Sequence, residues 1–183
     1  PYEFRDAVSE GVLAWNKSFE AAGFKNAVQV KVQPDNAGWD AGDIRYNVLR
    51  WTSSPSPPFG GYGPSFVNPK TGQILGADIM LEYVYFTNRV KYDKLFSPEA
   101  ADLNPSFCQI GNYVHQENLL GLISTEILQD GEAIKKDLIN ESIIRLVLHE
   151  VGHTLGLNHN FKSSHLHNIE ESHNAALTRA VGL

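Results

Sequence analysis

The apolar positions at the start of the chain predict a helix followed by a strand. Over residues 4–22 they recur at alternating steps of four and three, at Val8, Val12, Trp15, Phe19 and Ala22. This spacing forms one face of an α-helix. Gly23 stands where a glycine commonly ends a helix. Residues 27–32 alternate instead, with Val28, Val30 and Val32 on one face, which predicts a strand.

The middle of the chain predicts further strands around a loop. A second strand is expected over residues 44–51, and the Pro-, Gly- and Ser-rich residues 52–65 are expected to form a surface loop. A hairpin follows, in which a turn at 68–72 leads into a long strand over 74–86. Gly76 within that strand predicts either a β-bulge or a close approach of another backbone.

The second half of the chain predicts helices over residues 93–131, 141–155 and 169–180. The order is therefore a helix, several strands and then helices, which favours an α+β domain. A length of 183 residues suits one domain, so we expect residues 1–183 to form a single unit.

Charge and composition exclude several classes of protein. The net charge of −6 has no concentrated basic block, so we expect no nucleic-acid partner. No apolar run approaches the roughly 20 residues of a membrane span, so we expect none. The single cysteine, Cys108, excludes an intrachain disulfide framework, and we interpret it as a small buried residue. Because the chain begins at Pro1, we interpret it as a processed product or a piece of a longer protein.

The strongest chemical signal is a group of histidines near the end of the 141–155 helix. His149 and His153 are four residues apart, so their imidazoles lie on one helix face and can bind one Zn²⁺. Gly156 can adopt a positive φ and turn the chain, which lets His159 return as a third ligand. Glu150 lies about 100° around the helix, where its carboxylate can take a proton from a metal-bound water.

Three ligands leave a fourth tetrahedral position open, which is typical of a catalytic zinc site. A chance match of the five specified positions is on the order of one in 10⁵, given ordinary residue usage. His165 and His167 follow the third ligand and could approach the metal or substrate, but we interpret them as solvated loop residues, and His115 and His173 have no supporting spacing.

The motif HExxHxxGxxH, complete from His149 to His159, resembles the signature of the metzincin clan of zinc metallopeptidases. Other stretches resemble one branch of that clan, the large extracytoplasmic bacterial zinc-dependent metalloproteases. These stretches are residues 15–27, 43–47, 63–65, 68–75 and 159–164. The resemblance implies an extracytoplasmic protein that cleaves peptides, and we expect it to be a monomer.

The resemblance also implies a zincin-like fold, in which a twisted mixed sheet carries a backing helix and the active-site helix. Residues 76–82 would be the edge strand above the cleft, where a peptide adds as an antiparallel strand. Gly76, Ala77, Asp78 and Ile79 are therefore the expected substrate-binding residues. An edge covered by the proline-rich loop is the alternative.

One departure concerns the turn with a methionine that metzincins carry beneath the metal. The only methionine is Met80, upstream of the motif, so this Met-turn and any oxyanion-stabilising tyrosine near it are absent. We therefore expect an N-terminal subdomain over about 1–156 and the start of a truncated C-terminal subdomain over 157–183.

The predicted function is that of a zinc-dependent endopeptidase in which Glu150 is the general base and His149, His153 and His159 hold Zn²⁺. A catalytically inactive zinc-containing module that binds peptides is the alternative. A purely structural zinc is disfavoured, because the site is open and lacks cysteine ligands.

Overall fold

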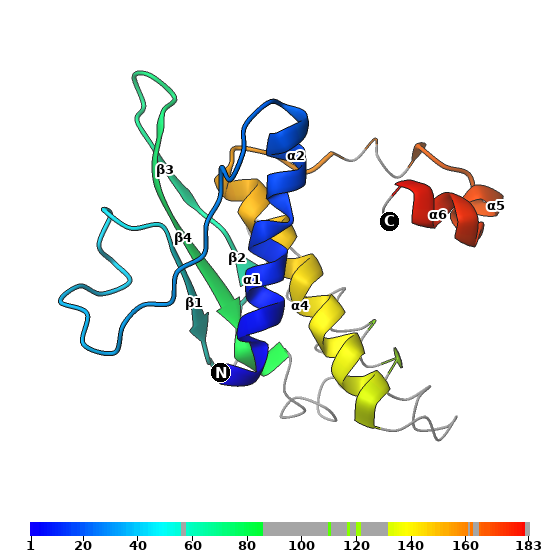
Figure 1. Ribbon diagram of the computed structural model, residues 1–183, viewed down its shortest axis with the longest axis horizontal. Helices are drawn as coiled ribbons and strands as arrows, with labels where there is room; N and C mark the ends of the chain where they lie inside the picture. Colours follow the sequence, from blue (N-terminus) through cyan, green and yellow to red (C-terminus); the bar gives the residue numbers. More distant parts are fainter. Residues whose placement is uncertain are drawn as a thin grey trace.

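A mixed four-stranded sheet and a long helix are the main elements of the structure, a computed structural model (Figure 1). It describes residues 1–55, 58–85, 110, 117, 120–121, 132–160, 162 and 165–181. The described chain begins with a 3₁₀ turn, η1 (Tyr2–Phe4), followed by α1 (Arg5–Leu13) and α2 (Trp15–Ala21). The later helices are α4 (Glu132–Thr154), α5 (Ile169–Ser172) and α6 (Ala175–Val181).

The longest strand, β4 (Ile74–Glu82), lies in the centre of the sheet and not at its edge. On one side it pairs in parallel with β1 (Val48–Thr52). On the other side it pairs antiparallel with β2 (Gly61–Tyr62) and β3 (Ser65–Val67).

The expectation of an edge strand over residues 76–82 is therefore wrong. The segment before the hairpin folds back along β4 and occupies the side that was expected to be free. The backbone N–H of Asp78 donates to the carbonyl of Pro64 (3.3 Å), which joins β2 and β3 into one continuous edge. The expected loop over residues 52–65 thus contains a short strand, because its glycines let the backbone approach both the sheet and a helix.

The hairpin between β3 and β4 carries the irregularity that Gly76 predicted. Phe66 is opposite Gly76 and Val67 is opposite Ile74, so the register shifts by one residue at this point. A Cβ added to Gly76 would lie 3.3 Å from the carbonyl oxygen of Ile44. The glycine therefore lies beside a bulge and also permits a close backbone approach.

The hydrophobic core lies between β4, α1 and α4. Its buried residues are Phe4, Ala7, Ile79, Leu81, Ile143, Leu146, Val147 and Val151. α1 packs along α4 so closely that a Cβ on Gly11 would lie 2.9 Å from the carbonyl oxygen of Ile144. The predicted α+β fold, with a mixed sheet, a backing first helix and a second helix packed on it, is confirmed.

The helix predicted at the start of the chain forms, but the strand expected after it does not. The helix is divided at Ala14 into α1 and α2, and it ends at Gly23 with a φ of 93°. Residues 27–32 form no strand, and Val32 is 60% exposed. The side-chain amide of Asn16 donates to the carbonyl of Val28 and accepts from its N–H, at 2.9 and 3.0 Å, so a side chain replaces a strand partner.

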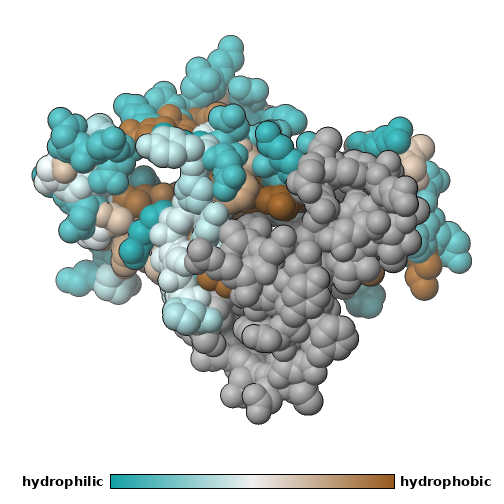
Figure 2. Space-filling model, turned by 90° about the horizontal axis from the view of Figure 1, so that it is seen from below, coloured by the Kyte–Doolittle hydropathy of each residue, from teal (hydrophilic) through white to brown (hydrophobic). Residues whose placement is uncertain are grey.

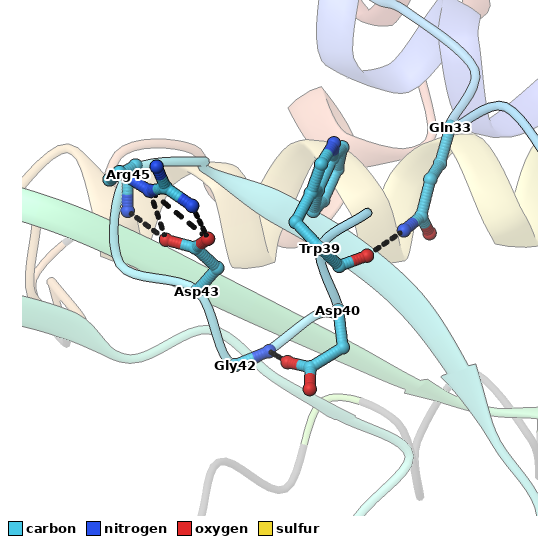
Figure 3. A network of polar contacts seen from close by, with 6 residues as sticks. All are labelled: Gln33, Trp39, Asp40, Gly42, Asp43 and Arg45. Atoms are coloured by element: carbon cyan, nitrogen blue, oxygen red, sulfur yellow. Dashed lines mark hydrogen bonds and ion pairs between the residues drawn. The ribbon is translucent and has the colours of Figure 1, made fainter. Parts of the chain in front are cut away.

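Residues 33–46 form a loop held by its own polar contacts (Figure 3). The Gln33 side chain donates to the carbonyl of Trp39 at 2.9 Å. The Arg45 guanidinium hydrogen bonds to Asp43, which lowers the pKa of that carboxyl to about 2. The Trp39 ring stacks on that of Tyr46 with centroids 3.8 Å apart. Because these contacts involve residues up to Tyr46, the strand expected from residue 44 begins only at Val48.

The predicted helices of the second half differ mainly in their bounds. α4 begins nine residues before the expected start at residue 141. The expected helix over 169–180 is divided into α5 and α6, and a capping box between Asn168 and Glu171 begins α5. The helix predicted over 93–131 lies outside the described residues, apart from four isolated helical positions.

None of the described helices combines the length and the apolar character that a membrane crossing requires. On the face drawn in Figure 2, the described hydrophobic residues form separate small patches among hydrophilic ones.

Candidate metal centre

The last turn of α4 ends in a loop that brings three histidines together. Gly156 has a φ of 91°, a left-handed conformation that an L-residue with a side chain adopts at a cost. The N–H of Gly156 donates to the carbonyl of His153 at 3.0 Å, and that of Leu157 donates to Gly152 at 3.1 Å. This pair of bonds is a Schellman motif, and it turns the chain back toward the helix. The predicted helix-ending role of Gly156 is confirmed.

One ring nitrogen from each of the three histidines lies within 4.8 Å of the other two. Nε2 of His159 lies 3.2 Å from Nε2 of His149 and 3.1 Å from Nε2 of His153. Ligands at about 2.0–2.1 Å from a tetrahedral zinc are about 3.3–3.4 Å from one another. The observed separations are close to that spacing, and imidazole nitrogens are common zinc ligands. The three predicted ligands thus lie where they can hold one metal ion.

The surroundings of His153 and His149 favour metal binding. Nδ1 of His153 lies 2.9 Å from the carbonyl oxygen of Leu157, so it carries the ring proton and Nε2 is left to coordinate. Burial, together with smaller contributions from the neighbouring His153, His159 and Arg145, lowers the pKa of His149 to about 4. Because its pKa is lowered, His149 is neutral at neutral pH, as a metal ligand must be.

Glu150 lies beside the triad and is completely buried, with 0% of its surface exposed. It packs against the edge of the sheet formed by β2 and the residue after it. A Cβ on Gly61 would lie 2.6 Å from Oε1 of Glu150, and one on Gly63 would lie 2.5 Å from its main-chain oxygen. Burial raises the pKa of Glu150 to about 7, and the nearby backbone of Gly63 opposes this rise.

The two carboxylate oxygens of Glu150 have no aligned hydrogen-bond partner among the described residues. A buried carboxylate without a partner is costly in free energy. A metal site in the adjoining triad, with water bound there, would provide that partner. The three imidazole nitrogens and the carboxylate of Glu150 therefore both fit a bound metal ion.

The four residues expected to bind substrate by strand addition lie in the interior of the sheet. Ala77 and Ile79 are buried, and Asp78 forms an ion pair with Arg50, with Nη2 3.0 Å from Oδ2. Gly76 is paired with β3 and adjoins Ile44. Because β4 has strand neighbours on both sides, the strand-addition role of these residues loses its structural basis.

The residues that lie next to Glu150 at the edge are Gly61 and Gly63, which the sequence reasoning missed. The available signal was the alternation of two glycines around Tyr62. The three histidines after the triad, His165, His167 and His173, lie outside it. His165 is exposed, and Nδ1 of His167 lies 3.5 Å from Oε2 of Glu171 at the start of α5.

Part of the chain matches a known family. Residues 131–183, less than a third of the chain, match the family described as Met-zincin. No curated protein and no solved structure matches the chain. The matched segment contains α4 and all three histidines, so the comparison supports a metzincin-type zincin and a zinc metallopeptidase-like domain.

Proposed function

We propose that this chain carries the active site of a zinc-dependent endopeptidase of the metzincin type. His149, His153 and His159 would hold Zn²⁺, and Glu150 would act as the general base. The observation that carries the proposal is the grouping of three imidazole nitrogens beside a buried carboxylate whose oxygens have no aligned hydrogen-bond partner among the described residues. A structural metal site has no use for such a carboxylate, whereas hydrolysis of a peptide bond requires a group that moves protons.

When bound, the metal would lower the pKa of water and polarise the carbonyl group of a substrate. Glu150 would accept a proton from the attacking water and return it to the leaving amine. General bases work best with a pKa near the working pH, and the environment of Glu150 moves its pKa in that direction. Gly61 and Gly63 pack against Glu150, which is completely buried.

A peptide substrate would lie along the edge formed by β2 and β3. Among the described residues, no strand pairs with the outer side of this edge. An extended peptide can therefore add there through main-chain hydrogen bonds. Gly61 and Gly63 bring this edge against Glu150, so the peptide backbone would lie close to the base and the metal.

The test compares zinc content and peptide cleavage in the purified protein, a Glu150→Gln variant and a Glu141→Gln control. Glu141 is an exposed carboxylate on the same helix. We expect bound zinc in all three proteins, and cleavage lowered about 10²–10⁴-fold in Glu150→Gln alone.

Undiminished cleavage by Glu150→Gln would remove Glu150 from the mechanism, and a protein that binds no zinc would remove the metal centre. Zinc binding and peptide affinity without cleavage in the unmodified protein would instead establish the peptide-binding module.

A further inference from the structure

We propose that Trp15 is a positioning residue of the metal centre and sets its affinity for zinc. Trp15 begins α2 and is distant from the histidines in sequence, yet it contacts α4 at two points around them. Trp15 would keep the site in shape, and this role rests on the proposed function because it assumes that the bound metal is zinc.

The first contact is a hydrogen bond to the helix backbone. The indole Nε1 of Trp15 donates to the carbonyl oxygen of Leu148 at 2.9 Å. Leu148 directly precedes His149, and in an α-helix its carbonyl also accepts from the residue four positions later. The indole therefore fixes the peptide plane that leads into the first ligand.

The second contact is between the six-membered ring of Trp15 and Gly152. A Cβ added to Gly152 would lie 3.0 Å from Cζ2 and 3.6 Å from Cη2 of the indole. Gly152 directly precedes His153, and its carbonyl accepts the Leu157 N–H in the turn that leads to His159. The ring therefore lies against the backbone from which the second ligand and the turn extend.

One side chain thus constrains the residue before each helical ligand. The two imidazoles extend from a helical segment that Trp15 contacts at Leu148 and Gly152. The Leu157 carbonyl that orients His153 belongs to the turn that begins at Gly152. Metal–ligand distances tolerate deviations of only about 0.2 Å, so a small shift of this backbone weakens coordination.

The experiment measures zinc dissociation constants by chelator competition and the visible absorption of the Co²⁺-substituted protein. The Trp15→Phe variant loses the Nε1 donor and part of the ring over Gly152. We expect zinc affinity to fall about tenfold, within the range usual for groups that orient metal-bound histidines, and the Co²⁺ bands to shift.

The matched control is Trp51→Phe. Trp51 lies in β1 and packs on Phe4 and Tyr83, with ring centroids 5.7 and 5.8 Å away, on the side of the core formed by the sheet. We expect this control to lower the melting temperature while leaving the zinc constant within about twofold of the unmodified protein.

The Gly152→Ala variant changes the same contact from the side of the helix. It provides the test if Trp15→Phe does not fold. Its methyl group would press on Cζ2, so we expect weaker zinc binding here as well. Wild-type affinity and Co²⁺ bands in the folded variants would overturn the role of Trp15 while leaving the proposed function intact. An unmodified protein that binds no zinc would overturn both.

Discussion

Adding one methyl group at Gly61 should disable Glu150 while sparing the metal ligands. The Cβ of an alanine there would lie 2.6 Å from Oε1, 2.9 Å from Cγ and 3.0 Å from Cδ of Glu150. All three distances are shorter than ordinary van der Waals contact. The φ of Gly61 lies outside the left-handed region, so alanine adds a steric contact without backbone strain.

The size of the effect follows from the overlap. Bringing the contact with Oε1 from 2.6 Å to an ordinary 3.4 Å requires a displacement of about 0.8 Å, and Glu150 has no exposed side to which it can retreat. A misplacement of about 1 Å in a reacting group costs roughly 10²-fold in rate. Overpacking a buried site costs about 1–3 kcal/mol of stability. We therefore expect Gly61→Ala to cleave peptides about 10²-fold more slowly.

The assay follows peptide cleavage, zinc content and urea unfolding, with Gly38→Ala as control. No described residue lies within 4 Å of a Cβ at Gly38, and its φ is also outside the left-handed region. The control should therefore match the unmodified protein. Cleavage by Gly61→Ala within twofold of the unmodified rate, with zinc bound, would refute the placement of Glu150 beneath the edge strand.

Two further variants test the turn after α4 and the contacts that hold the loop before β2. Gly156→Ala places a side chain at a φ of 91°, which should cost about 1–2 kcal/mol and weaken zinc binding through His159; unchanged unfolding and zinc titrations would contradict this. Glu82→Gln removes a buried carboxylate that accepts from Thr52 Oγ1 and the Ser54 N–H, each at 2.9 Å. It should lower stability by about 1.5–3 kcal/mol in urea unfolding and leave zinc affinity unchanged, and equal stability would show that the amide replaces both bonds.

The triad could be predicted from the sequence because its geometry is local. The spacing from His149 to His153 is fixed by the helical repeat, and the return of His159 is fixed by a left-handed glycine. The convergence of the three rings therefore follows from residues close together in sequence, whereas the contact of Trp15 with the same helix could not be predicted from spacing. The α+β class was also predictable, since it depends on the order of periodic segments.

The neighbours of each strand could not be predicted in this way, because they depend on pairing between distant segments. Alternation along β4 is the same in a central strand and in an edge strand, so the sequence did not reveal that residues 61–67 lie beside it. A strand as short as Gly61–Tyr62 has no periodic pattern to detect. Residues 27–32 have the pattern of a strand, yet the side chain of Asn16 takes the place of a partner.

The metal ligands and the surroundings of Glu150 come from parts of the chain at very different distances in sequence. The three ligands lie within 11 consecutive residues, so the loops that must close to bring them together are short and cost little entropy. Glu150 obtains its dry environment from glycines roughly ninety residues earlier in the chain, a contact of high sequence separation that forms slowly. We expect the helix and its turn to capture zinc during folding before the sheet edge closes over Glu150. Retention of the metal and competence in hydrolysis are thus acquired at different stages.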